Sequence, residues 1–118
     1  MKTFLFILSF TFLFSISNIY PASHLVTNDA DDSYGIIDGT LRRAITLAKN
    51  GDTIFFADTI NHIVIYRDII VQNQKKLTII GGSGSKKVTI DGNHRCGIFS
   101  LFNIDTFNIN NLILINSA

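Results

Sequence analysis

Two short copies of one alternating pattern stand in the middle of the chain. In residues 76–81 and 87–92, a basic residue is followed by an apolar residue, Thr, Ile, one further residue and Gly. Alternate side chains of a strand point to opposite faces, so each copy predicts a short strand that has one apolar face and ends at a turn. Strands this short bury their apolar face only when many of them stack. The repeat therefore predicts a coiled, solenoid-type β structure.

The chain after residue 52 continues this pattern. It predicts strands at residues 53–57, 62–66, 69–71, 77–80, 88–90, 98–104, 107–109 and 112–115. Ile54, Ile79 and Ile104 recur at equal intervals, and the interval suits a coil of three short strands in a parallel β-helix. In such a fold the Asn residues at turns are expected to stack as hydrogen-bonded ladders. These are Asn93, Asn103, Asn108, Asn110, Asn111 and Asn116.

Residues 40–50 form the one segment with helical periodicity. Its apolar residues recur at the spacing of one helix face. They are Leu41, Ala44, Ile45 and Ala48, and the opposite, outward face is expected to hold Arg42, Arg43, Thr46 and Lys49. Thr40 is suited to begin the helix as N-cap and Gly51 to end it. We expect the helix to cover one end of the β stack, because the end coil of a solenoid exposes apolar surface.

The segment at residues 1–22 is typical of a secretory signal. Lys2 precedes a run at residues 4–16 that is apolar except for Ser9, Thr11 and Ser15. This run has the length of a signal core and falls short of the roughly 20 apolar residues that a membrane span needs. The pattern predicts export to the cell surface, the outer membrane or the extracellular space; an uncleaved N-terminal anchor is the alternative.

Composition narrows the class of protein further. The formal net charge is +1, which gives no reason to expect a nucleic-acid partner. All nine acidic residues are Asp, whose short side chain suits turns, whereas Glu suits helices. Cys96 is the single cysteine, which excludes an internal disulfide and a multi-cysteine zinc site.

Few side chains suggest chemistry. Cys96 with His94 as its base is a conceivable nucleophile pair, but the two are only two positions apart and no third group is evident. A turn with a small, half-buried cysteine explains them better. The acidic loop at residues 28–35 lacks the Gly and Glu that an EF-hand needs at its sixth and twelfth positions, so we expect a solvated turn.

Two further combinations are candidate sites. His24, His62 and His94 are scattered along the sequence, and their meeting at a metal ion would be a chance match. Asp91 and Arg95 resemble the Asp and Arg of calcium-dependent polysaccharide lyases, but Asp91 is explained more simply as a corner residue after a short strand. The sequence therefore predicts no catalytic residue, no cofactor and no metal site.

The ordered set of segments resembles the N-terminal region of bacterial surface β-helix proteins. These are of the polymorphic-outer-membrane-protein and autotransporter-passenger type, with a cap motif that reads Cys-Ser-Leu-Arg-Glu-Ala. The resemblance is carried by residues 25–27, 39–48, 51–56, 77–81 and 88–92. This chain has Gly39-Thr40 in place of the Cys-Ser pair and Arg43 in place of Glu or Gln. The resemblance implies a mainly β fold, a right-handed parallel β-helix of the pectate-lyase-like kind with an N-terminal capping strand and helix.

The resulting domain organisation is a signal peptide at 1–22, a cap at 23–52 and the first coils of a β-helix at 53–118. Family members run longer, so the resemblance implies a truncated member that is incomplete at its C-terminal end. We expect an exported structural or adhesive module with no chemistry of its own. Its expected partners are a ligand on a host or cell surface and a second copy bound at the last coil. A fragment of a carbohydrate-active enzyme and a non-functional remnant are the alternatives.

Overall fold

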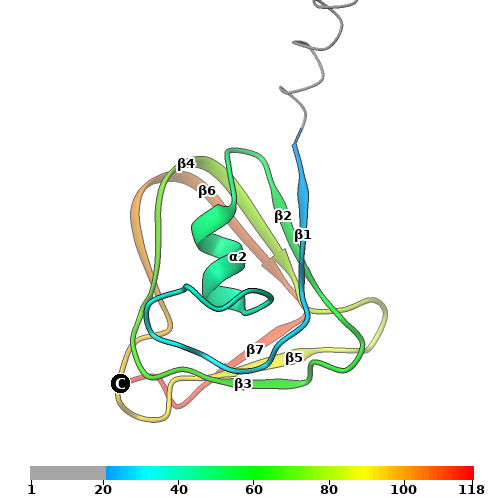
Figure 1. Ribbon diagram of the computed structural model, residues 1–118, viewed down its shortest axis with the longest axis vertical. Coiled ribbons are helices and arrows are strands. Elements are labelled where there is room, and N and C mark those ends of the chain that lie inside the picture. The colour runs from blue at the N-terminus through cyan, green and yellow to red at the C-terminus, as the bar shows by residue number, and fades with distance from the viewer. Residues whose placement is uncertain (1–20) are drawn as a thin grey trace, which may run out of the picture.

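The computed structural model describes residues 21–118, with only the backbone described at residues 74 and 75. The described chain is mainly β, with seven strands and one short helix (Figure 1). The elements are β1 (Ser23–Val26), α2 (Leu41–Leu47), β2 (Thr53–Phe56), β3 (His62–Val64), β4 (Ile69–Ile80), β5 (Val88–Asp91), β6 (Phe99–Asn110) and β7 (Leu112–Ile115).

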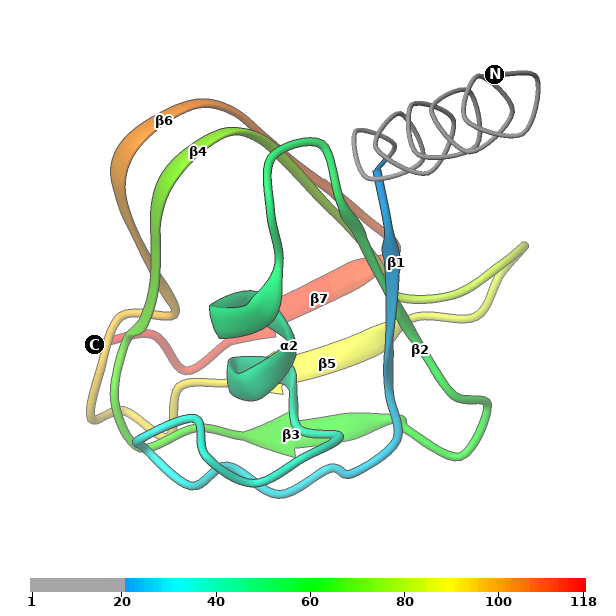
Figure 2. The ribbon, with the colours of Figure 1, turned by 45° about the horizontal axis from the view of Figure 1, so that its top comes forward.

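All strand pairs are parallel, and they form two sheets. One sheet has the order β1-β2-β4-β6 and the other the order β3-β5-β7. From β2 to β7 the chain alternates between the two sheets, so each return adds a strand at the same edge of each sheet. Figure 2 shows β4 and β6 as two neighbouring arches on one side, and β3, β5 and β7 side by side across from them.

The predicted register is confirmed for its first step and wrong for its second. Ile54 lies opposite Ile79, as the spacing of the isoleucines predicted. Ile79, however, lies opposite Ile109, and Ile104 lies opposite Gln74. The step from β4 to β6 is therefore longer than the step from β2 to β4.

The extra residues of the longer step lie in the turns on either side of β5, because residues 69–79 of β4 pair with residues 99–109 of β6 without any insertion. The structure also merges two pairs of predicted strands into one continuous strand each. Strand β4 contains both residues 69–71 and residues 77–80. Strand β6 contains residues 107–109 and all of residues 98–104 except residue 98. Asn73 and Asn103 have positive φ angles of 61° and 54°, so each bends its strand without ending it. Asn tolerates this left-handed conformation better than most residues, and alternation alone does not distinguish such a bend from a turn.

The core lies between the two sheets and is built by alternate strand positions. In the two sequence repeats, Leu77, Ile79, Val88 and Ile90 are fully buried, which confirms the predicted alternation. The helix adds Leu41, Ala44 and Ile45 to the same cluster, joined by Ala48 just after it. At about 25 cal/mol per Å² of buried apolar area, this cluster is the main favourable contribution to folding.

The helix begins as predicted and ends earlier than predicted. The hydroxyl oxygen of Thr40 accepts a hydrogen bond from the N–H of Arg43, which confirms Thr40 as N-cap. Ala48 is already extended, with φ −65° and ψ 142°. The carboxylate of Asp52 accepts the N–H of Lys49 at 2.8 Å, and this bond replaces the helical one that would have continued α2.

The expected outward position of Arg42 is wrong. Arg42 is only 8% exposed, and its guanidinium forms two hydrogen bonds, of 2.7 and 2.9 Å, with the carboxylate of Asp31. It also donates to the backbone carbonyls of Arg67 and Asp68. The acidic loop folds over the start of α2 and buries Arg42, whereas Thr46 on the same face stays exposed.

The expected solvated turn at residues 28–35 is accordingly wrong in part. The side chain of Asp31 is 2% exposed in its ion pair with Arg42. Desolvation opposes ionisation of Asp32, but its carboxylate accepts the N–H groups of Ile37, Gly35 and Ile36, and these bonds hold its pKa below the ordinary range. The loop is thus ordered by its own carboxylates rather than by solvent.

The predicted signal sequence lies almost wholly outside the described residues. Within residues 21–118, no helix is long and apolar enough to span a membrane.

Candidate functional site

The last strand of each sheet leaves the core uncovered. The inward-facing residues of β6 and β7 are the register equivalents of residues that are fully or almost fully buried one layer earlier. We call these six residues and the strands that carry them the open end: Phe99, Leu101, Phe107, Ile109, Leu112 and Leu114.

The loss of burial at the open end is large. Val71, Ile79 and Ile90 are each 0% exposed, whereas their equivalents one layer on are 48%, 39% and 41% exposed. Those equivalents are Leu101, Ile109 and Leu114. A contiguous exposed apolar surface of this kind marks a site of interaction with another surface.

Backbone groups of β6 are also unpaired along this edge. The carbonyl of Ile98 accepts the N–H of Ile69, and the carbonyl of Asn110 accepts the N–H of Gly81, so both point toward β4. Successive residues of a parallel strand direct their N–H and C=O groups to opposite sides. The four inward-facing residues of β6 therefore direct theirs to the open edge.

The same holds for β7. The carbonyls of Asn111 and Ile115 accept the N–H groups of Val88 and Gly92 in the preceding layer. The N–H and C=O groups of Leu112 and Leu114 consequently point away from β5. Edges of this kind are templates for strand addition.

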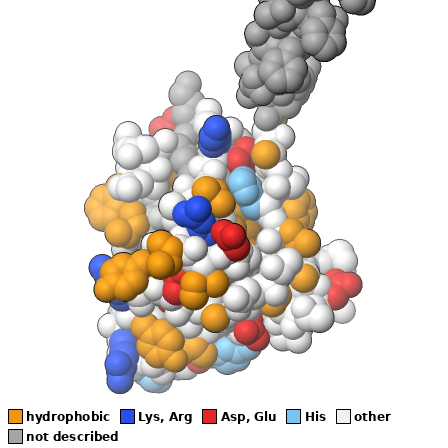
Figure 3. Space-filling view, viewed as in Figure 1, with side chains coloured by type: hydrophobic (Ala, Val, Ile, Leu, Met, Phe, Trp, Pro, Cys, Tyr) orange, Lys and Arg blue, Asp and Glu red, His pale blue; other side chains and the backbone are white. Residues whose placement is uncertain are grey.

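The opposite end of the stack is closed. There, α2 packs against β1 and β4, and Leu41 and Ile45 are 1% and 3% exposed. The two ends also differ in charge. Figure 3 shows Lys, Arg, Asp and His side chains among the hydrophobic ones on the face that carries α2. Within residues 99–118, Asp105 is the one ionisable side chain.

The structure does not bring His94 and Cys96 into a nucleophile pair. Cys96 is 8% exposed, and its thiol contacts the carbonyls of Gly92 and Ile65 at 3.5 and 3.9 Å. Burial, with a smaller contribution from Asp68, raises the pKa of this thiol, so the reactive thiolate is disfavoured. His94 is exposed, and its backbone N–H donates to the backbone carbonyl of Asn116.

The three histidines lie in separate places. His24 contacts Asp52 at 2.8 Å on the four-stranded sheet, and His62 contacts Asp91 at 3.2 Å on the three-stranded sheet. Among residues 21–118 no group of three or more His, Cys, Asp or Glu side chains is placed to hold a metal ion.

Asp91 is held by its neighbours at the corner after β5. Its carboxylate accepts the N–H of Asn93 and the side-chain amide of Asn116, and it also contacts His62. The first two hydrogen bonds, and more weakly His62, hold the pKa of Asp91 below its ordinary range. These hydrogen bonds make Asp91 a structural residue at this corner. The side chain of Arg95 is exposed.

The predicted Asn ladders form at one place in the described chain. The amide of Asn103 donates to the side-chain oxygen of Asn73 at 3.3 Å, at the two positions where β4 and β6 bend. Asn111 donates instead to the carbonyl of Gly82, and Asn116 to Asp91.

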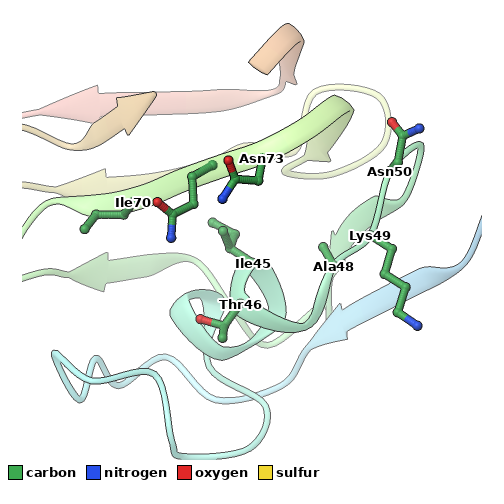
Figure 4. A pocket seen from close by; sticks show the side chains of 8 residues that line it. Ile45, Thr46, Ala48, Lys49, Asn50, Ile70 and Asn73 are labelled. Atoms are coloured by element: carbon green, nitrogen blue, oxygen red, sulfur yellow. The ribbon is translucent and has the colours of Figure 1, made fainter. Parts of the chain in front are cut away.

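Sequence analysis did not identify a hollow of about 470 Å³ between α2 and the start of β4. Ile45 and Thr46 line it from the helix, and Ile70 and Asn73 line it from the strand (Figure 4). It is open to solvent, and Lys49 is its one ionisable lining residue. Apart from Lys49, the residues that line it offer amide, hydroxyl and apolar groups.

Comparisons with known proteins found no match, so the assignment of a function rests on the geometry described above. No family model matches the chain, no curated protein matches it, and no solved structure matches it.

Asp52 joins the closed end to the first strand, which leads to a prediction about pH. Burial opposes ionisation of Asp52, but the N–H groups of Ala22 and Lys49 and the ring of His24 outweigh it, so its pKa is lowered. A lowered pKa stabilises the fold above the unfolded pKa of about 3.9 and loses this effect as the pH falls below it.

We expect Asp52→Asn to lower the free energy of unfolding by about 1–3 kcal/mol at pH 7, because an amide NH₂ would face donors that need acceptors. The difference from the wild-type chain should shrink below about pH 4, where the unfolded carboxylate takes up a proton. Urea unfolding of both chains at pH 7 and pH 3 measures this. An equal difference at the two pH values would contradict it.

Proposed function

We propose that this protein is an exported structural or adhesive module of the right-handed parallel β-helix type. In this proposal residues 23–52 are the cap and residues 53–118 are the first coils, as in the N-terminal region of bacterial surface passengers. The alternation of strands between two parallel sheets, with each strand added at the same edge, supports the coil assignment. The resemblance of the capping helix and the Thr-Ile-x-Gly repeats supports the family.

One observation carries the functional part of the proposal, namely the difference between the two ends. Helix α2 covers one end, whereas the other presents unpaired edges. Of its six inward residues, Leu101, Ile109 and Leu114 are about two-fifths to one-half exposed, and the other three are partly buried. A closed end and an open end are what a module needs if it begins a stack and receives further β structure at its last layer. The role is therefore one of support and binding.

A structural role is favoured over a carbohydrate-active enzyme by the state of the candidate residues. A lyase of the pectate-lyase kind needs a carboxylate free to bind calcium, and Asp91 is occupied by Asn93 and Asn116. A nucleophile or base must be accessible and suitably ionised, and Cys96 is buried with a raised pKa.

The proposal is tested by comparing binding with turnover. The full chain, expressed in a bacterium with an epitope tag in the exposed turn around Ser83, is assayed for surface exposure, for binding to immobilised cell-surface polysaccharide, and for release of sugar products. We expect exposure on whole cells and no product. Product release that Asp91→Asn abolishes would favour the enzyme instead, and retention of the tag inside the cell would contradict the proposed location.

Export also predicts loss of the N-terminus. Mass spectrometry of the exported protein should show a first residue between Asn18 and His24, because the apolar run at residues 4–16 has the length of a signal core. Recovery of chains that still begin at Met1 in the membrane fraction would contradict this prediction.

A further inference from the structure

The inward apolar residues of β6 are arranged symmetrically about one position. Leu101 and Phe107 lie at equal distances along the strand on either side of Ile104, and so do Phe99 and Ile109. Ile104 itself packs against the core at the bend next to Asn103. Two β6 strands that run antiparallel about Ile104 would therefore place every inward residue opposite another inward residue.

The backbone of β6 has the same symmetry. Ile98 and Asn110 direct their carbonyls to β4, so the inward residues next to them in the alternation direct their N–H and C=O groups to the open edge. Two of these inward residues precede Ile104 and two follow it. In the antiparallel arrangement Phe99 lies opposite the partner's Ile109, and Leu101 opposite the partner's Phe107. Each such pair can exchange two backbone hydrogen bonds, which satisfies the free edge.

The strand β7 fits the same axis. Ile113 lies between Leu112 and Leu114, the two residues whose backbone groups point to the open edge. Figures 1 and 2 show β6 as an arch with β7 across from it. A single twofold axis that passes through Ile104 and Ile113 therefore pairs both open strands with their own copies at once.

Charge favours the same partner. Asp105 is the one ionisable side chain in residues 99–118, so two open ends face each other with little repulsion. In the antiparallel register Asp105 lies opposite the partner's Asn103, which is an amide donor, and not opposite a second carboxylate. A strongly charged partner would find no complementary charge on this surface.

From these observations we infer that a second copy of this chain covers the open end, forming a dimer with twofold symmetry through Ile104 and Ile113. A twofold contact is isologous, so the same patch serves both subunits. The inference rests on the proposed function in that both assign a binding role to the open end, but it requires neither export nor an extended β-helix.

Single cysteines placed in the full chain test the register. In Ile104→Cys the two thiols face each other across the axis, at a non-hydrogen-bonded pair with Cα atoms about 4.5 Å apart, within the range of a disulfide. Phe102 and Thr106 are exposed and lie opposite each other in the two subunits. Phe102→Cys alone or Thr106→Cys alone places the two thiols about 13 Å apart, whereas a mixture of the two variants brings them together.

Under mild oxidation we expect Ile104→Cys to form at least tenfold more cross-linked dimer than Phe102→Cys or Thr106→Cys alone. We expect an equal mixture of those two variants to form about half as much cross-linked dimer as Ile104→Cys, because about half of its dimers pair one variant with the other. The wild-type chain controls for Cys96, whose thiol is buried. A parallel strand from another protein or from more of the same chain would leave all of these thiols apart, and non-specific association would cross-link all of them equally; either result would overturn the inference.

The outcome is separable from that of the proposed function. Register-specific cross-links in a chain that stays inside the cell would support the dimer and contradict the exported role. An exported chain without these cross-links would keep the exported role and overturn the dimer.

Discussion

Arg42→Ala is expected to lower the free energy of unfolding by about 3–5 kcal/mol, because it leaves the buried carboxylate of Asp31 without its partner. The side chains of Arg42 and Asp31 are 9% and 2% exposed, and two hydrogen bonds of 2.7 and 2.9 Å join them. Arg42 also satisfies the carbonyls of Arg67 and Asp68 at the start of β4. The change would therefore release the acidic loop, the helix and this corner together.

Thermal and urea unfolding of the variant measure the effect. Arg95→Ala is a matched control, since Arg95 is exposed and its loss should cost about 0.5 kcal/mol or less. Arg42→Lys should recover only part of the stability, because an ammonium group cannot form the two parallel hydrogen bonds of a guanidinium. If Arg42→Ala and Arg95→Ala unfold alike, the ion pair does not hold the loop on the helix.

The expected cost has a further check in a double variant. Asp31→Leu combined with Arg42→Leu removes both charges, and buried ion pairs replaced by apolar residues are often close to neutral in stability. We therefore expect the double variant to be more stable than Arg42→Ala. The comparison separates the cost of an unpaired charge from that of lost packing.

Ile45→Asp is expected to destabilise the fold by several kcal/mol, which is comparable to the whole stability of a small domain. Ile45 is 3% exposed on the inward face of α2, in the same apolar cluster as Ile54 and Val71. An aspartate there would be buried with no partner for its charge.

The same helix supplies the control for this prediction. Leu47 is 48% exposed, so Leu47→Asp should cost about 0.5 kcal/mol or less. Circular dichroism during thermal unfolding compares the two variants directly. Equal melting temperatures would show that α2 does not cover the core, and the assignment of a closed end would then be lost.

Much of the fold was predictable because it depends on local periodicity. The alternation in the two sequence repeats is reproduced by the buried positions of Leu77, Ile79, Val88 and Ile90. The spacing of Ile54 and Ile79 predicted their pairing. Thr40 as N-cap was predictable because its partner, the N–H of Arg43, lies within the first turn of the helix.

The errors arise where a residue depends on a partner distant in sequence. Arg42 has an outward position by helix periodicity, and only the return of Asp31 over the helix turns that position into a buried ion pair. The end of α2 depends on Asp52, which takes the N–H of Lys49. The second step of the register depended on the turns on either side of β5, which are longer than those on either side of β3.

The open end shows the same division. The sequence by itself determined that residues 107–116 are apolar, β-prone and uncharged, because composition and alternation are local properties. Only the tertiary structure decided that Leu101, Ile109 and Leu114 lie on one uncovered surface, because this depends on the layer into which each strand is added. Pairing between strands that are distant in sequence sets that layer, and no local pattern of side chains encodes it.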